Sequence, residues 1–181
     1  MDRTWLLLIY TVPAEPTRKR AYIWRELKKV GAVYLRDGVC ALPEQPESVD
    51  AVRPIAAKVE EFEGHATVVE GARLDPTRTA WLVEQARAAR AEEYEDIARQ
   101  ARRLLEHIAR ETEHRDFTFA ELEELEADLT KLKRWAEQVR RRDYFGDAGE
   151  AELHALLDSC DHALGAFLEQ TASLEIETTT T

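Results

Sequence analysis

The hydrophobic positions of this chain follow two different patterns, one up to about residue 75 and another beyond it. Residues 5–12 (WLLLIYTV) form a short apolar run that a proline ends, as in a strand buried on both faces. Thr17 is placed to cap a helix that runs to Val30, and Gly31 supplies its stop. The chain therefore opens with a strand followed by a helix.

The next segments continue this alternation of strands and helices. Asp37-Gly38 separates two apolar runs, which predicts a hairpin with a type I′ turn because both residues tolerate positive φ. A helix is expected over residues 48–63, started or kinked by Pro54, and residues 65–70 (HATVVE) resemble a strand. The order β-α-β-β-α-β predicts a ferredoxin-like antiparallel sheet with two helices on one face. The apolar side of the second helix carries Val52, Ile55, Val59 and Phe62.

Beyond residue 75 the apolar positions recur at helical spacing. One helix is expected from Thr79 to about Thr112. A second begins with Thr118 and Glu121, which match a capping box. The apolar positions of this second helix form a seam that requires a partner helix: Leu122, Leu125, Leu129, Leu132, Ala136 and Val139.

A third helix is predicted to follow, capped by Asp147 with Glu150. Its inward positions are Leu153, Leu156, Leu157, Cys160, Leu164 and Phe167. The three helices are expected to form an antiparallel bundle, packed against the sheet domain or a second subunit. The predicted fold is therefore α+β. A ferredoxin-like domain (1–75) precedes a helical bundle (76–175) and a disordered tail (176–181).

The charges are distributed unevenly along these domains. The 181 residues carry a net charge of −11, and an average of that sign disfavours a general polyanion binder. Residues 1–75 have a net charge of −1 and residues 76–181 one of −10. Within the first domain, residues 17–36 hold seven basic residues and one acidic residue, a net of +6. An acidic protein thus contains one concentrated basic element.

Helical geometry divides this element into two faces. Ile23, Trp24, Leu27 and Val30 share one face, which is expected to pack on the sheet. The opposite face carries Arg18, Tyr22, Arg25 and Lys29. Cations in a first helical turn are disfavoured by about 0.3–1 kcal/mol each, so the Arg18-Lys19-Arg20 run suggests an anionic partner. A solvated charged face is the alternative. The candidate nucleic-acid-binding residues are Arg18, Lys19, Arg20, Arg25, Lys28 and Lys29.

Two sequence blocks resemble the N-terminal domain of the chromate-resistance regulator family ChrB. They are WLLLIYTVPAEPTRKRAYIWRELKKVGAVYLRDGVCALPE and FTFAELEELEADLTKLKRWAEQVRRRDYFG, in the family's order. The resemblance implies a chromate-responsive transcriptional regulator whose basic N-terminal region contacts the promoter of a resistance operon. It also implies that the six basic residues above contact phosphate.

One difference from the family pattern affects the sensing role. Full-length ChrB proteins continue into a C-terminal domain associated with the chromate response, and this chain ends before such a domain. It is expected to be a short member or a truncated form, with a separate ChrB C-terminal-like protein as a potential partner. A homodimer is also expected. The alternative function is a protein–protein interaction module that binds no DNA and docks a partner through the seam of residues 122–139.

Other residue patterns are better explained without chemistry. His154, Asp158 and His162 have the spacing of a metal site, but they border the apolar face, which indicates a solvated helix flank. Glu111 and His114 form a single E-x-x-H pair, where a di-iron bundle needs two. We therefore predict no catalytic residue, no cofactor and no metal ligand, and a protein that is not an enzyme. Stoichiometric metal in the purified protein would instead support the alternative that it is a metal-dependent enzyme.

The remaining features concern the compartment of the protein. Cys40 and Cys160 are 120 positions apart, match no disulfide framework and are expected to be buried and inert. The N-terminal apolar run is too short for a membrane span and lacks a signal-peptide cleavage pattern. A cytoplasmic protein without membrane contact is expected.

Overall fold

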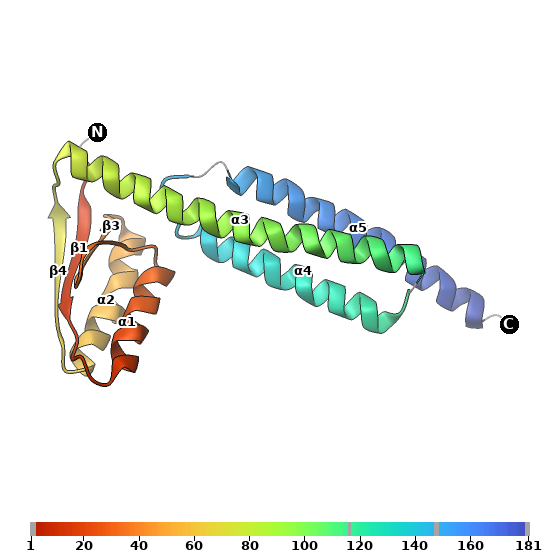
Figure 1. The fold of residues 1–181 in the computed structure, drawn as a ribbon, viewed down its shortest axis with the longest axis horizontal. Coiled ribbons are helices and arrows are strands. Elements are labelled where there is room, and N and C mark those ends of the chain that lie inside the picture. The colour runs from red at the N-terminus through yellow and green to blue at the C-terminus, as the bar shows by residue number, and fades with distance from the viewer. Residues whose placement is uncertain (1–2, 116, 147–148, 180–181) are drawn as a thin grey trace. The chain divides into compact units, whose positions relative to one another are not determined.

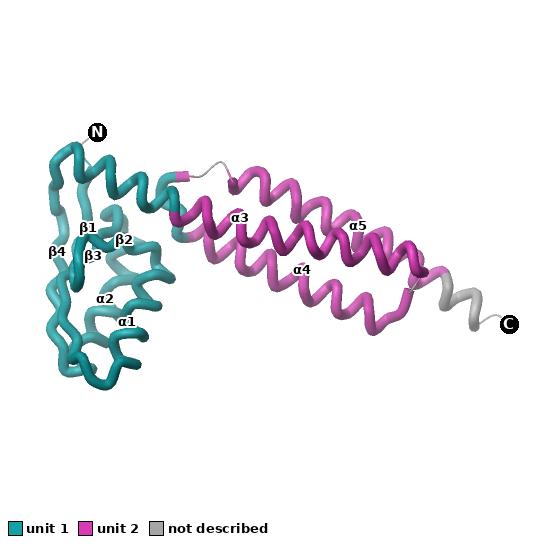
Figure 2. Tube along the Cα trace, in the orientation of Figure 1, with its two compact units in different colours: residues 1–88, 142–145 teal, residues 89–141, 146–181 magenta. Residues whose placement is uncertain are grey.

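The structure is a computed structural model that describes residues 3–115, 117–146 and 149–179. The chain divides into two compact units (Figure 2). Residues 1–88 with 142–145 form the first, which we call the sheet unit. Residues 89–141 with 146–181 form the second, which we call the three-helix unit.

The sheet unit has the predicted ferredoxin-like architecture. Its four strands are antiparallel in the order β2-β3-β1-β4, and both helices lie on the same face (Figure 1). The element order β-α-β-β-α-β is therefore confirmed. The elements are β1 (Trp5–Thr11), α1 (Thr17–Lys29), β2 (Val33–Arg36), β3 (Val39–Pro43), α2 (Pro46–Glu61) and β4 (His65–Ala72).

The core beneath the two helices agrees with the predicted apolar faces, except at Trp24. Ile23 and Leu27 of α1 are fully buried, and Val30 packs against the same cluster. Trp24 was expected on this face but is 51% exposed, so that prediction is wrong. The buried stripe of α1 consists of Ile23 and Leu27. Trp24 is turned about 100° around the helix axis from Ile23, which places it outside this stripe. The buried members of the core are Leu6, Leu8, Ile23, Leu27, Ala32, Cys40, Leu42, Val52, Ile55 and Val59.

The opposite face of the sheet is covered over only part of its length. Trp5, Ala41 and Leu82 form a second buried cluster there, and the Trp5 ring lies 6.2 Å from that of Phe145. This cover does not extend to Ile9, which is 44% exposed. The prediction that β1 is buried on both faces therefore holds for its first half and fails for its second.

The hairpin between β2 and β3 is confirmed, with a different turn. Gly38 has φ +70°, but Asp37 is not among the described residues with positive φ, so the turn is not type I′. The Tyr10 amide of β1 donates to the Gly38 carbonyl at 2.7 Å. A Cβ atom at Gly38 would lie 2.4 Å from the Tyr10 carbonyl oxygen, so only glycine fits between the turn and β1.

The helix ends differ from the prediction by small amounts. The N-cap of α1 is Pro16, and Thr17 is the first helical residue, with no capping bond from a side chain. Gly31 has φ +80° just after the C-cap, which confirms the predicted stop. Helix α2 begins at Pro46, before the predicted start, because proline suits the first helical turn, and Pro54 lies inside the helix.

The three-helix unit contains three helices that run side by side in alternating directions (Figure 1). They are α3 (Pro76–His114), whose first part belongs to the sheet unit, α4 (Phe119–Arg140) and α5 (Gly149–Thr179). The Thr118 hydroxyl accepts a hydrogen bond from the Glu121 amide at 3.2 Å, as the capping box predicts. The predicted cap at Asp147 lies outside the described residues. Helix α5 continues past the predicted boundary at 175, since the sequence after Gly165 contains no Gly or Pro, and residues 180–181 are not described.

The seam on α4 is occupied within the unit. Its leucines and Val139 are buried against residues of α3 and α5, so the partner helices of the seam belong to the same chain. Cys160 is buried in this core, as expected. Among the described residues, no helix combines the length and apolarity needed to cross a membrane. The main buried residues are Tyr94, Ile97, Ala101, Leu104, Ile108, Leu122, Leu125, Leu129, Leu132, Val139, Leu153, Cys160 and Phe167.

Candidate nucleic-acid interface

The three arginines among the six predicted basic residues present unpaired charges on α1. Arg18, Arg20 and Arg25 are exposed. Within the described part of the chain, none of the three makes an ion pair or a hydrogen bond. Their guanidinium groups therefore keep all their donors for a ligand.

The three lysines of the predicted set lie differently. The Lys19 ammonium is 3.2 Å from Glu63 Oε2 and contacts the Phe62 carbonyl oxygen at 3.4 Å, and its side chain is only 22% exposed. Lys29 pairs with Glu26 at 2.6 Å within the helix. The Lys28 ammonium lies 5.9 Å from the centre of the Trp24 ring. In the described part of the chain Lys28 thus has no ion pair, and it adds its charge to that of the arginines.

Trp24 contributes an aromatic surface that the sequence-based assignment missed. It lies on one helical stripe with Arg20 and Lys28, since four residues separate each from the next. This spacing was the signal that could have placed Trp24 among the basic residues. Arg20 and Trp24 line a hollow of about 650 Å³, together with Tyr10, Tyr34, Thr17 and Gly38.

The floor of this hollow carries a hydrogen-bonded pair of tyrosines. The hydroxyl groups of Tyr10 and Tyr34 are 2.8 Å apart. Burial raises the pKa of both phenols above the ordinary value of 10.0. Both groups are therefore neutral near pH 7, and the charged residues that line the hollow are Arg20 and Asp37. Burial also raises the pKa of the adjacent Cys40 thiol to about 12, so this cysteine remains protonated and unreactive.

The N-terminus of α1 adds to the attraction for anions. Its first turn contains no acidic residue, and its N-cap Pro16 supplies no side-chain hydrogen bond. The amide groups at the start of a helix carry partial positive charge and bind phosphate oxygens. The Lys19 amide already donates to the Pro16 carbonyl at 3.0 Å, so this end of α1 combines the positive end of the helix dipole with Arg18 and Arg20.

A second run of basic residues, 140–142, lies at the end of α4, and two of its arginines share a carboxylate partner. Arg140 and Arg141 both hydrogen-bond to Glu137, at 2.8 and 3.0 Å. These bonds lower the pKa of Glu137 to about 2, and the bond from Arg140 has the larger effect. The two arginines therefore have a carboxylate partner already, unlike those of α1.

The histidines proposed as ordinary surface residues do not converge on a common point. The His154 Nδ1 atom is 3.1 Å from an Asp158 carboxylate oxygen, whereas the His162 Nδ1 atom contacts the Asp158 backbone oxygen at 2.7 Å. Asp161 is paired with Lys133 at 2.6 Å. A different group does converge: His107, Glu111 and Glu121. The sequence reasoning missed it because its members come from two helices.

Comparison with known proteins agrees with these features. A family model described as "Protein ChrB, N-terminal" matches residues 20–177. The chain belongs to the ChrB N-terminal family. The match spans the basic helix from Arg20 onward and nearly all of the three helices that follow, so the resemblance seen in the sequence is confirmed.

One ChrB relative matches a short segment of this chain. Protein ChrB of Cupriavidus metallidurans is 40% identical over 45 residues, which is 25% of this chain and 14% of that protein. The matched segment is therefore a small part of that relative. No solved structure matches the ChrB-family chain described here.

Proposed function

We propose that this ChrB-family chain contacts DNA through α1 and takes part in regulating a chromate-resistance operon. The observation that supports this most directly is the set of exposed, unpaired arginines Arg18, Arg20 and Arg25. They lie in a segment of net charge +6 beside the exposed Trp24 ring. Membership in the ChrB family supports the regulatory context.

The charge distribution favours a local contact. Phosphate contacts supply most of the affinity of a protein for DNA. Each contact makes the slope of log K against log salt concentration more negative by about 0.9. The acidic remainder of the chain, with a net charge of −10 over residues 76–181, repels the same backbone. We therefore propose that α1 makes a few contacts and that a homodimer doubles their number.

A DNA titration tests this proposal. Labelled duplex from the promoter upstream of the protein's own gene is titrated at several salt concentrations, with fluorescence anisotropy as the readout. The wild-type protein is expected to bind at low salt. The combined change Arg18→Ala, Arg20→Ala, Arg25→Ala is expected to weaken binding and to reduce the magnitude of the salt slope by roughly 3 for each bound protomer, and therefore by roughly 5 for the homodimer.

The three-helix unit offers a matched control. Arg103, Arg110 and Lys131 are also exposed and make no ion pair or hydrogen bond in the described part of the chain. Changing all three to alanine alters the net charge equally, but is expected to affect binding much less. Equal losses in both triple variants, or a wild-type protein that does not bind at low salt, would overturn the proposal.

A further inference from the structure

Three side chains with metal-binding atoms converge in the three-helix unit, between the end of α3 and the start of α4. His107 and Glu111 lie one turn apart on α3, and Glu121 lies in the first turn of α4. The His107 Nε2 atom is 3.4 Å from Glu111 Oε1 and 3.2 Å from Glu121 Oε1. One atom from each residue lies within 4.8 Å of the others. We propose that these residues bind a divalent transition-metal ion such as Zn²⁺.

The distances fit such an ion. Zinc bonds to histidine nitrogen and carboxylate oxygen are about 2.0–2.2 Å long, so two ligands at a tetrahedral angle are separated by roughly 3.3 Å. The two distances from His107 Nε2, 3.2 and 3.4 Å, lie on either side of this value. Small rotations of the glutamate side chains are then sufficient to place all three ligands around one ion.

The charges and donor types also suit a divalent ion. A neutral imidazole and two carboxylates carry a charge of −2, which a divalent cation neutralises. If His107 carries a proton on Nε2, that proton can be donated to only one of the two carboxylates at a time. A metal ion can bond to all three groups simultaneously. One nitrogen and two oxygens favour zinc and its first-row neighbours over the softer ions that thiolates select.

Partial burial shields the cluster from solvent but leaves it accessible to an ion. The three side chains are 30, 18 and 19% exposed, in the order His107, Glu111, Glu121. Partial burial strengthens the attraction between the carboxylates and a cation compared with a fully exposed helix surface. The remaining exposure leaves room for water as a fourth ligand.

Such an ion would join α3 to α4 across the connection between them. Because all three ligands belong to the three-helix unit, the proposal is independent of DNA contact by α1. The sequence predicts no metal ligand here, because its two metal-like patterns are the Glu111–His114 pair and the His154, Asp158 and His162 face. The ligand from α4 becomes visible only when the two helices are packed together.

Metal titration of the full-length protein without an affinity tag is the test. After treatment with chelator, the protein is titrated with Co²⁺ and then with Zn²⁺, and visible absorption and calorimetry are recorded. Wild type is expected to bind one Co²⁺ with the absorption of a low-coordinate site, and Zn²⁺ is expected to displace it. Thermal unfolding is expected to shift upward with Zn²⁺.

The variants separate metal binding from an ordinary ion pair. His107→Ala and Glu111→Gln are each expected to weaken binding at least about 100-fold, since loss of even an outer-shell partner costs about 10–100-fold. Glu121→Gln retains the backbone amide that donates to the Thr118 cap, so it tests the third ligand in a helix that still has this capping bond. Circular dichroism verifies that each variant is folded.

His154 supplies the matched control. It also pairs with a carboxylate four residues away, at 3.1 Å, but its side chain is 79% exposed. His154→Ala is therefore expected to leave metal binding unchanged. If the three residues form only ion pairs and bind no metal, the results will differ. Wild type will then show no stoichiometric binding, or wild type and His107→Ala will bind metal equally. Either result would overturn the proposal, as would an equal loss in His154→Ala.

Discussion

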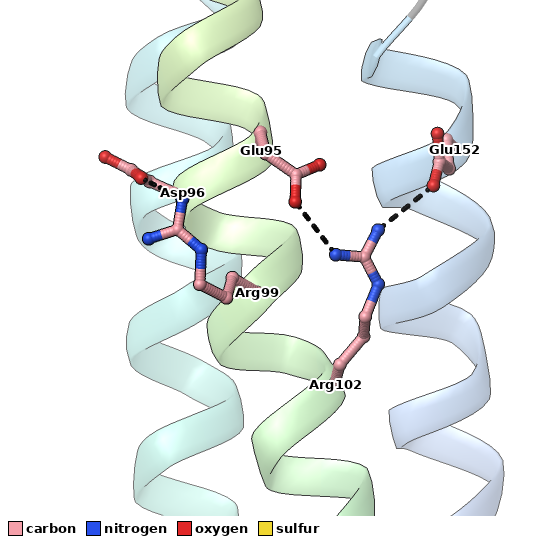
Figure 3. Close-up of polar contacts among 5 residues, drawn as sticks. All are labelled: Glu95, Asp96, Arg99, Arg102 and Glu152. Atoms are coloured by element: carbon pink, nitrogen blue, oxygen red, sulfur yellow. Dashed lines mark hydrogen bonds and ion pairs between the residues drawn. The ribbon is translucent and has the colours of Figure 1, made fainter.

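Arginines that hold helices together within the three-helix unit contrast with the exposed arginines of α1. In the three-helix unit, Arg102 donates to Glu95 at 3.0 Å and to Glu152 at 3.1 Å, which links α3 to α5 (Figure 3). Arg99 donates to Asp96 at 2.8 Å on the same helix (Figure 3). In the sheet unit, α1 presents arginines that have no ion pair in the described part of the chain: Arg18, Arg20 and Arg25.

This difference shows why net charge is a poor guide to charged surfaces here. Many cations of residues 76–181 are held by nearby carboxylates, and the excess acidic residues set the net charge of −10. In α1, one acidic residue accompanies the arginines, and it pairs with Lys29. A cation with no nearby carboxylate remains available to an external anion, whatever the average charge.

The largest expected effect tests whether apolar packing, rather than these ion pairs, stabilises the three-helix unit. Phe167 is buried and its ring lies 5.1 Å from that of Phe117. Phe167→Ala is expected to lower the free energy of unfolding by about 3–5 kcal/mol, because it opens a cavity. The neighbouring Leu168 is 43% exposed, and Leu168→Ala is expected to change it by less than about 0.5 kcal/mol. Urea unfolding followed by circular dichroism measures both. Similar losses would contradict the assigned core.

A smaller effect should distinguish paired from unpaired arginines. Arg102→Ala removes the contacts to Glu95 and Glu152, so it is expected to reduce stability at low salt and to have less effect at high salt. Arg18→Ala removes a cation from the first turn of α1 and is expected to leave stability unchanged or raise it by about 0.3–1 kcal/mol. Urea midpoints at two salt concentrations compare them. A loss of stability in Arg18→Ala would show that this residue has an internal partner after all.

The smallest effect concerns pH. The folded-state pKa of Glu137, about 2, is below the ordinary value of 4.5 because of the hydrogen bonds from Arg140 and Arg141. Its stabilising contribution is therefore complete above about pH 4.5 and disappears as the pH falls toward 2. The difference in urea midpoint between wild type and Glu137→Gln is expected to follow this range. The control is Glu124→Gln, an exposed glutamate on the same helix. A constant difference at all pH values would contradict the assignment.

The fold was predictable because its signals are local. Ile23 and Leu27 mark the buried stripe of α1, Asp37-Gly38 marks the hairpin, and Thr118 marks the start of α4. The details that failed depend on neighbours that are distant in sequence. The turn at Gly38 is fixed by a hydrogen bond to Tyr10 of another strand, and this contact leaves no trace in the turn sequence.

The candidate site was predictable only in part, for the same reason. The basic residues of α1 and the Glu26 partner of Lys29 are visible in the sequence, but the more distant contacts are not. Lys19 meets Glu63, which is 44 residues away, and Trp24 lines a hollow with Tyr34. Among the lysines, the contact of Lys19 depends on this tertiary packing, whereas Lys28 and Lys29 contact Trp24 and Glu26 of the same helix.

The sequence by itself determined the order of the elements, the α+β class, the family resemblance and the segregation of charge along the chain. These properties depend on periodicity, turn residues and composition, which are all written in consecutive residues. The tertiary structure decided which cations of α1 remain unpaired, and that His107 and Glu111 meet Glu121. Such contacts join residues from different elements, so they are fixed only when those elements pack.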